Sequence, residues 1–338
     1  MRLARLPVLA LLALLIPVGC TQTQPADEAT APPSADPTVA ARLRLPAEGP
    51  TRPRQALSLV PESAEAVVLT DYDRLRARFG VEDLTSDSLV TDRLAFWEKA
   101  GREAVLLTEG LLRSEDSLLR LDYGFTQDDV AWEARFTGDD GPGWVLAFRP
   151  GQDMAEVRRA VDDGAGPLAD AEVLPARRLV VSGTAEDGEP VWGYDAGWAP
   201  LVDDTAESTY LHDGCLDVNA ALGPDADVED QQQVADLVAS LEPLDGFAVG
   251  FADDLATARF EADRIDLHRR ADLSAAWPTA GQPAVADGFD DLQVADPKSG
   301  RLGLFVEEPR AAAALTLTGR LPFAVCDELT PLAEPTGL

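Results

Sequence analysis

The chain is poor in the side chains that most often carry out chemistry. Its 338 residues include two histidines, three cysteines and two lysines, Lys99 and Lys298. The histidines, His212 and His268, lie far apart in the sequence, and no two cysteines are close together. Zinc sites in proteins draw on closely spaced histidine and cysteine ligands. The sequence therefore predicts no zinc site.

Common catalytic and cofactor-binding motifs are missing as well. There is no Gly-x-Ser-x-Gly stretch, no Gly-x-x-x-x-Gly-Lys phosphate loop and no convincing Gly-x-Gly-x-x-Gly fingerprint. We therefore expect no cofactor, and a non-catalytic protein is the preferred hypothesis. Carboxylates are abundant, with 60 aspartates and glutamates, but no pair of them stands out. A hydrolase that uses two carboxylates stays open as the alternative.

Basic residues are scarce relative to acidic ones. The 28 lysines and arginines leave a formal net charge of -32 at pH 7. Such a surface repels nucleic acids and anionic lipid headgroups, so no nucleic-acid partner is expected. The excess of carboxylates either keeps the protein soluble by self-repulsion or binds cations weakly.

The first twenty residues have the pattern of an export signal. The chain starts with two positive charges, Arg2 and Arg5, which are followed by an apolar core from residue 6 to 16. Small residues then lead into Cys20. A helix that spans a bilayer needs roughly 20 apolar residues, so this stretch is too short for a permanent anchor. It is typical of a cleaved secretory signal, and we predict that residues 1–19 are a signal peptide.

The end of this signal resembles the lipobox of bacterial lipoprotein precursors. Val18, Gly19 and Cys20 match the family pattern, whereas Pro17 stands where the family usually has Leu. The resemblance implies that Cys20 carries fatty-acyl chains such as palmitate and anchors the protein to the extracytoplasmic side of the cell membrane. Two or three acyl chains give stable anchoring. The alternative is an ordinary secreted protein in which Cys20 has no special role.

Residues 20–55 are predicted to form a disordered tether. Seven prolines fall among alanine, threonine, glutamine and glutamate in this stretch, which has few large apolar side chains. A flexible chain of this length spans roughly 30 Å root-mean-square. The globular part, expected to begin near Ala56, would then stand away from the membrane.

The two remaining cysteines, Cys215 and Cys326, are predicted to form a disulfide. They are an even pair in a chain that is expected to be exported, and exported proteins fold in an oxidising compartment. Two buried free thiols are the alternative.

The globular part has the pattern of an α+β fold, with antiparallel hairpins packed against helices. Apolar residues make up 46% of the chain, enough for a packed core. Alternating patterns predict strands and helical spacing predicts helices. Expected helices cover 72–79, a cap within 71–121, a segment from Asp153 and 234–241; expected strands cover 66–70, 130–137, 144–149, 179–181, 191–194, 247–251, 257–262, 302–306 and 313–317.

We predict two lobes, residues 56–202 and 203–338, because a helix followed by a hairpin occurs in both. A related topology in the two lobes is a hypothesis, since no repeat is visible residue by residue.

Aromatic residues in the expected strands are the candidate ligand-binding residues. At alternating strand positions they are usually core. If they line an open cleft, they would hold an apolar or carbohydrate ligand, and a large internal cavity would instead make the protein a carrier of apolar molecules. The residues considered are Trp132, Trp144, Phe148 and Trp192.

Two further patterns have a structural and a functional interpretation. Asp225, Asp227, Glu229 and Asp236 begin like a calcium loop, but the sixth position lacks glycine and the last ligand is not glutamate; carboxylates at a helix start explain them equally. His212 lies three residues before Cys215, as a base beside a nucleophile could.

Together these features predict a membrane-tethered extracytoplasmic lipoprotein that serves as a binding or interaction module. Its partner would be the membrane, through the lipid, and either an envelope protein or a small molecule. His268 falls in the charged run 266–272, which we predict to be a solvated strand or loop.

Overall fold

The computed structural model describes residues 51–138, 141–279, 283–290 and 294–332. No helix within these ranges is both long enough and apolar enough to cross a membrane.

The predicted signal peptide, Cys20 and the tether up to residue 50 lie outside the described residues. The described chain begins with helix α2 (Arg52–Leu57), which has a proline in its first turn. The prediction that the tether extends to residue 55 was therefore wrong at its end, because these residues pack as a helix with buried Ala56 and Leu57.

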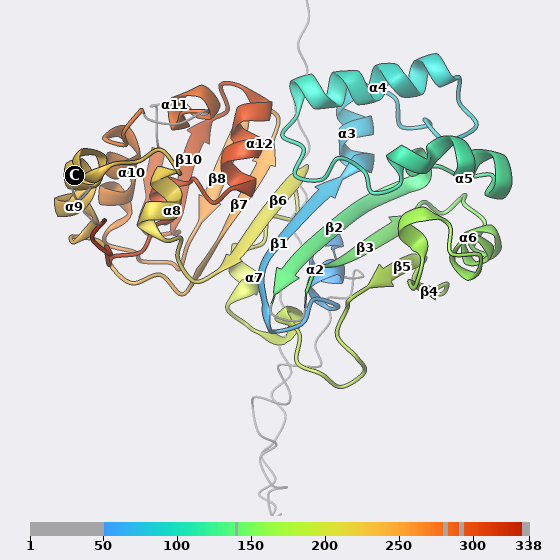
Figure 1. Ribbon diagram of the computed structural model, residues 1–338, viewed down its shortest axis with the longest axis horizontal. Coiled ribbons are helices and arrows are strands. Elements are labelled where there is room, and N and C mark those ends of the chain that lie inside the picture. The colour runs from blue at the N-terminus through green and yellow to red at the C-terminus, as the bar shows by residue number, and fades with distance from the viewer. Residues whose placement is uncertain (1–50, 139–140, 280–282, 291–293, 333–338) are drawn as a thin grey trace, which may run out of the picture. The chain divides into compact units, whose positions relative to one another are not determined.

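The protein has the expected α+β fold, built on one ten-stranded antiparallel sheet (Figure 1). The strand order is β4-β5-β3-β2-β1-β6-β7-β8-β10-β9. The strands are β1 (Ala64–Asp71), β2 (Val130–Gly138), β3 (Gly143–Phe148), β4 (Glu172–Leu174), β5 (Leu179–Ser182), β6 (Ser208–Asp213), β7 (Gly246–Ala252), β8 (Leu255–Arg259), β9 (Val294–Asp296) and β10 (Arg301–Phe305).

The two halves of the sheet have the same strand order. Counted outward from the centre, the first half runs β1-β2-β3-β5-β4 and the second runs β6-β7-β8-β10-β9. The halves meet where β1 pairs with β6 in antiparallel orientation, with Leu69 opposite Thr209. One continuous sheet therefore joins the two predicted lobes, 56–202 and 203–338. The division of the chain into two lobes remains a prediction.

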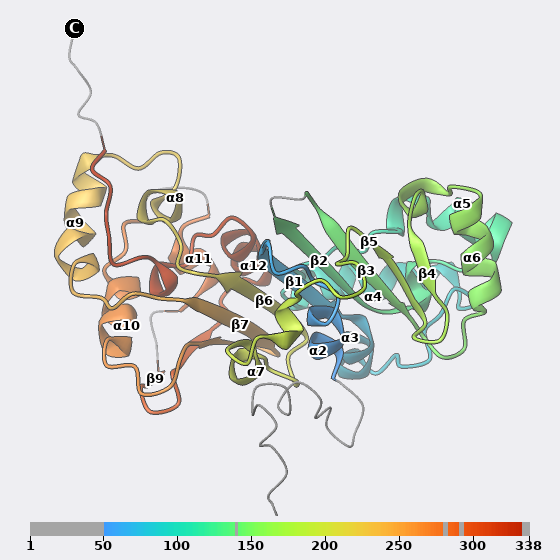
Figure 2. The same ribbon diagram turned by 90° about the horizontal axis from the view of Figure 1, so that it is seen from below.

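Helices of the first half cover both faces of the sheet. On one face, α3 (Tyr72–Phe79), α4 (Val90–Glu103), α5 (Asp116–Tyr123) and α6 (Met154–Asp162) enclose a core that includes Leu75, Phe125 and Leu146. On the other face, α2, the 3-10 turn η4 (Trp192–Tyr194) and α7 (Trp198–Leu201) close a second core around Val67 and Trp132. Figure 2 shows α5 and α6 together near β4.

Helices of the second half enclose the third core, which includes Phe247 and Leu302. These helices are α8 (Val218–Leu222), α9 (Val228–Val238), α10 (Leu267–Ala275), α11 (Val285–Gly288) and α12 (Pro309–Leu317). Short 3-10 turns complete the chain: η1 (Arg113–Glu115), η2 (Gln127–Asp129), η3 (Gly166–Leu168) and η5 (Pro322–Ala324).

Three expected elements differ from the structure. The stretch 313–317, predicted as a strand, lies in α12, because Glu308 caps the helix and Pro309 occupies its first turn. The stretch 191–194, also predicted as a strand, forms η4. The run 266–272, predicted to be solvated, belongs to α10, in which Arg270 is fully buried.

Candidate functional site

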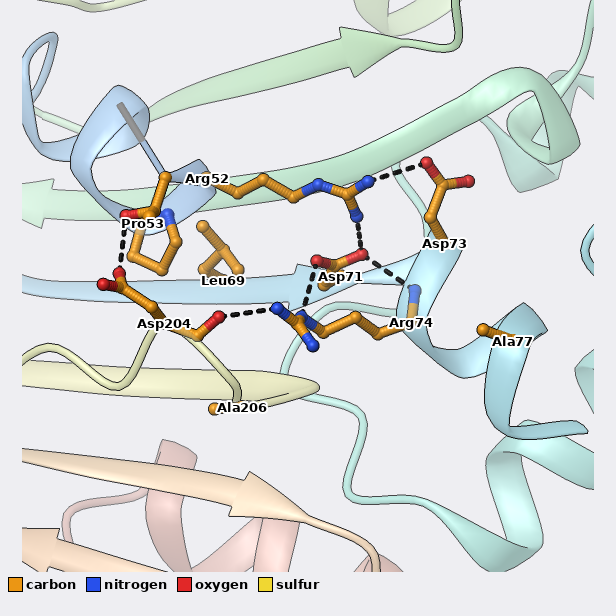
Figure 3. A pocket seen from close by; sticks show the side chains of 10 residues that line it. Arg52, Pro53, Leu69, Asp71, Asp73, Arg74, Ala77, Asp204 and Ala206 are labelled. Carbon is orange, nitrogen blue, oxygen red and sulfur yellow. Dashed lines mark hydrogen bonds and ion pairs between the residues drawn. The ribbon is translucent and has the colours of Figure 1, made fainter. Parts of the chain in front are cut away.

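A pocket of about 310 Å³ opens at the centre of the sheet, where three distant segments meet (Figure 3). The start of α2 contributes one wall, the end of β1 and the first turns of α3 contribute the second, and the segment before β6 contributes the third. The pocket is lined by Thr51, Arg52, Pro53, Leu69, Asp71, Asp73, Arg74, Ala77, Asp204 and Ala206.

Asp71 is the buried charge of this pocket. It ends β1 and caps α3, where its side chain accepts a hydrogen bond from the backbone N–H of Arg74 at 3.0 Å. Arg52 pairs with Asp71 from α2, and the Arg74 Nε lies 3.3 Å from the other carboxylate oxygen. Only 2% of Asp71 is exposed. Burial raises the pKa of this carboxyl, and the two guanidinium groups oppose the shift.

Three arginines contact Asp73: Arg76 from the same helix, Arg52 from α2, and Arg149 from the segment after β3. Arg52 Nη2 lies 2.9 Å from one carboxylate oxygen, and Arg76 Nη1 lies 2.7 Å from the other. Arg149 adds a contact of 3.2 Å through its Nε. Arg52 therefore bridges Asp71 and Asp73, and both carboxylates are already compensated by the protein.

The mouth of the pocket is formed by Asp204 and Arg74, whose side chains are 40% and 44% exposed. Thr51 Oγ1 donates to Asp204 at 2.5 Å, and Arg54 approaches the same carboxylate at 4.0 Å. Arg74 Nη2 donates to the backbone carbonyl of Asp204 at 2.6 Å. Both side chains are partly exposed, and in Figure 3 the Arg74 guanidinium meets the backbone carbonyl of Asp204 while the Asp204 carboxylate points away from it, on the side of Pro53.

The candidate aromatic residues do not form a common cleft. Trp132 and Trp192 are buried in the core closed by α2 and α7, and Phe148 is buried in the core under α3 to α6. Trp144 is partly buried against the same core as Phe148. The pairing of β2 with β3 sets Trp132 opposite Ala147 and Trp144 opposite Arg135, so Trp132 and Trp144 lie on opposite faces of the sheet. None of these four aromatic residues lines the pocket at Asp71.

The acidic stretch from Asp225 is a helix start in the structure. Asp227 caps α9, accepting from the backbone N–H groups of Glu229 and Asp230 at 2.8 and 3.0 Å. Within the described residues, no group of three or more histidine, cysteine, aspartate or glutamate side chains is arranged to hold a metal ion. The calcium interpretation, which also used Asp225 and Asp236, is therefore not supported, because Asp227 serves the helix instead.

Cys215 and Cys326 form the predicted disulfide, with their Cα atoms 4.9 Å apart. The bond removes Cys215 as a nucleophile for His212. The His212 side chain lies on β6 and stacks on Phe247 with ring centres 5.6 Å apart, and burial lowers its pKa. His268 lies in α10.

The carboxylate pair that best fits the hydrolase alternative lies beneath α4. Asp116 and the fully buried Asp128 both contact Arg93, and Trp97 Nε1 donates to Asp128 at 2.9 Å. Burial raises the pKa of Asp116 to about 6. Neither residue lines the pocket at Asp71, and every one of these groups is engaged with a neighbour, so the network connects α4 to α5 and η2.

A second pocket of about 160 Å³ lies in the second half, between the end of α10, α11 and β10. Trp277, Phe289, Leu304 and Phe323 contribute to its lining. Its volume is about half that of the pocket at Asp71. The carrier hypothesis required a large cavity lined by the aromatic hairpin, and this pocket contains none of those residues.

No family model, curated protein or solved structure matches this chain.

Sequence reasoning missed the pocket at Asp71. Its residues come from distant stretches of the chain; Thr51 and Asp204, which share a hydrogen bond, are 153 positions apart. The one local signal is the run Asp71, Tyr72, Asp73, Arg74 directly after a buried strand. Arg52 was hidden because it belonged to the predicted tether.

Proposed function

We propose that the protein is a membrane-tethered extracytoplasmic lipoprotein whose globular part binds a small zwitterionic molecule in the pocket at Asp71. The address rests on the apolar signal and Cys20, together with the Cys215–Cys326 disulfide, which suits an oxidising compartment. The observation that carries the binding role is the accessible pair of opposite charges, Arg74 and Asp204, at the mouth of a pocket of about 310 Å³.

The charges in the pocket select the class of ligand. Asp71 and Asp73 are each paired with at least two arginines, so a simple cation finds only Asp204 as a partner. A simple anion must approach a protein with a formal charge of -32. A molecule with one carboxylate and one ammonium group matches the exposed parts of Arg74, which also pairs with Asp71, and of Asp204, and it brings no net charge.

The size of the pocket sets an upper bound on this ligand. Pockets for small molecules begin at about 300 Å³, so the pocket at Asp71 suits a compound of the size of an amino acid or a dipeptide. Leu69, Ala77 and Ala206 supply its apolar lining. These small and aliphatic side chains leave room for a short side chain on the ligand.

Isothermal titration of the mature full-length protein in detergent tests the ligand class. The probes are a panel of α-amino acids and dipeptides, with the matching free amines and free carboxylates for comparison. We expect binding only for members that carry both charges. Arg74→Gln and Asp204→Asn should each weaken it by about tenfold or more, equivalent to about 1.4 kcal/mol.

Arg102→Gln is the matched control, because Arg102 is an exposed arginine on α4 whose partners are Glu98 and Glu103. It should bind like the wild type. Equal binding of the amines alone, or an equal loss in the Arg102 variant, would show that the pocket is not the zwitterion site.

The membrane address is tested separately. Metabolic labelling with a radioactive fatty acid should mark the wild-type protein, and Cys20→Ser should abolish both the label and the membrane association. A Cys20→Ser protein that stays bound to the membrane would rule out the lipid anchor while leaving the ligand measurements intact.

A further inference from the structure

The outer surface of the first half carries a group of exposed aliphatic side chains on α4 and α5. Their exposed fractions range from 44% to 84%, although their neighbours on the same helices, such as Phe96 and Leu119, are buried. Exposed apolar groups that cluster in this way often mark an interaction site. We call these residues the aliphatic patch: Leu89, Val90, Leu94, Leu118 and Leu121.

Ion pairs hold the two parts of the aliphatic patch beside each other. Arg93 of α4 lies 3.4 Å from Asp116, the first residue of α5. Arg120 of α5 lies 2.6 Å from Asp87, two residues before Leu89. Two ion pairs therefore link the beginning of α4 and the segment before it to α5, which lies near that end of α4 in Figure 1.

The side of α4 that contacts the segment around α5 carries Arg93 and Trp97, and the patch residues Val90 and Leu94 are exposed next to it. The Arg113 guanidinium, just before α5, lies 4.4 Å from the centre of the Trp97 ring. Residues four apart lie on one side of a helix, so Val90 and Leu94 lie together, and they are 63% and 64% exposed whereas Trp97 is buried. Leu118 and Leu121 are likewise three residues apart on α5. The four side chains thus belong to neighbouring surfaces of one patch.

The border of the aliphatic patch is acidic. Asp83, Asp92 and Asp122 are exposed, and among the described residues none of them forms an ion pair. Two of the nearby cations are paired with carboxylates, since Arg93 contacts Asp116 and Asp128 and Arg120 contacts Asp87, whereas Arg113 lies over the Trp97 ring. A partner with an apolar stripe flanked by positive charges therefore complements both features of this surface.

We propose that the aliphatic patch is the docking site for a basic amphipathic helix of a partner protein. Such helices place one apolar face against an apolar surface. An anionic membrane surface and a second copy of this acidic chain would both meet repulsion at the border. The proposal concerns a surface separate from the pocket at Asp71 and does not depend on the ligand of that pocket.

Fluorescence anisotropy with two synthetic peptides tests the proposal. One peptide is an amphipathic helix with leucines on one face and lysines on the other, and its twin has glutamates in place of the lysines. With the mature full-length protein, the lysine peptide should bind with an affinity that falls as salt rises, and the glutamate twin should not bind.

The combination Leu94→Glu with Leu121→Glu separates apolar docking from adsorption to an acidic protein. The added carboxylates would strengthen a purely electrostatic attraction of the lysine peptide, whereas they would disrupt apolar contact between the peptide and the patch. We expect this variant to weaken binding by about tenfold or more. Leu94→Ser with Leu121→Ser should weaken it too without a change in charge, and circular dichroism checks that both variants fold.

Ile265→Glu with Leu317→Glu is the matched control, since these exposed residues (70% and 50%) lie in the second half. It should bind at least as well as the wild type. Unchanged binding by the patch variant, or an equal loss in the control, would refute the proposal. A dimer in sedimentation experiments that the patch variant abolishes would assign the patch to a second copy and refute it as well.

Discussion

Trp192 and Trp198 stack face to face, with ring centres 4.1 Å apart and planes inclined by only 10°. Both indoles are at least nine-tenths buried, in the core closed by α2 and α7. Trp192 was one of the candidate ligand-binding residues. The stack instead makes it part of the contact between η4 and α7, so its removal should affect stability.

Trp192→Ala is expected to lower the free energy of unfolding by about 3–5 kcal/mol, because a large buried ring leaves a cavity. Urea unfolding followed by circular dichroism measures it. Tyr194→Ala is the control from the same turn, since Tyr194 is 65% exposed, and it should change stability by less than about 0.5 kcal/mol. Similar losses in the two variants would contradict the structural role of the stack.

The Cys215–Cys326 disulfide joins residues 111 positions apart in the sequence. Replacing both cysteines with serine should lower the free energy of unfolding by about 4–5 kcal/mol in the chain-entropy model, because the unfolded chain loses a constraint on a long loop. Reduction of the wild-type protein should also add two hydrogen atoms to its mass. An unchanged mass after reduction would contradict the disulfide.

Arg270 and Arg269 are neighbours on α10 with opposite environments. Arg270 is fully buried, pairs with the buried Asp266 at 2.8 Å, and donates to the carbonyls of Phe323 and Val325. Arg270→Ala leaves these buried groups without their donor and should lower the free energy of unfolding by about 3–5 kcal/mol.

Arg269→Ala is the control for this prediction. Arg269 is exposed and donates only to the Ser240 carbonyl, at 2.6 Å, in the described residues. It should change stability by less than about 0.5 kcal/mol. If both variants unfold at the same urea concentration as the wild type, the buried cluster contributes no net stability.

Asp116 makes the stability of the protein depend on pH. Burial raises its pKa to about 6 from 3.8, so the folded state binds a proton more tightly than the unfolded state does. Its contribution to stability is therefore fully present below about pH 4 and is lost as the pH rises to about 6.

The Asp116→Asn variant isolates this contribution. The wild type should lose stability relative to the variant as the pH rises from about 4 to about 6, and the difference should then level off. Urea unfolding at several pH values measures both proteins. The carboxyls whose pKa values are lowered, Asp203 and Asp266, occur in both chains and cancel. A constant difference across this range would contradict the raised pKa.

Local sequence signals predicted the elements in which a residue caps or ends its own segment of the chain. Asp153 caps α6 as expected, and Gly80 ends α3 in the left-handed conformation. Alternation in β2 and β3 predicted their hairpin. The error at α12 arose because a run of alanines and leucines suits a helix or a strand, although Glu308 and Pro309 already marked a helix start.

The candidate site was beyond prediction because local patterns do not say which charges are buried. Asp71 and Arg270 look like the solvated charges around them in the sequence. Their burial depends on partners such as Arg52 and Phe323, which are brought near only by the packing of the sheet and its helices. The sequence left open whether the aromatic candidates are core or line a cleft, and only the pairing of β2 with β3 shows that Trp132 and Trp144 lie on opposite faces of the sheet.

The sequence by itself determined the α+β class and the pairing of Cys215 with Cys326, because periodicity and cysteine count do not depend on the order of strands. Only the tertiary structure decided that two halves with one strand order join through β1 and β6. It also decided that Thr51, Asp71 and Asp204 share a pocket. Long-range pairing of strands places these residues together, and no local pattern along the chain specifies that pairing.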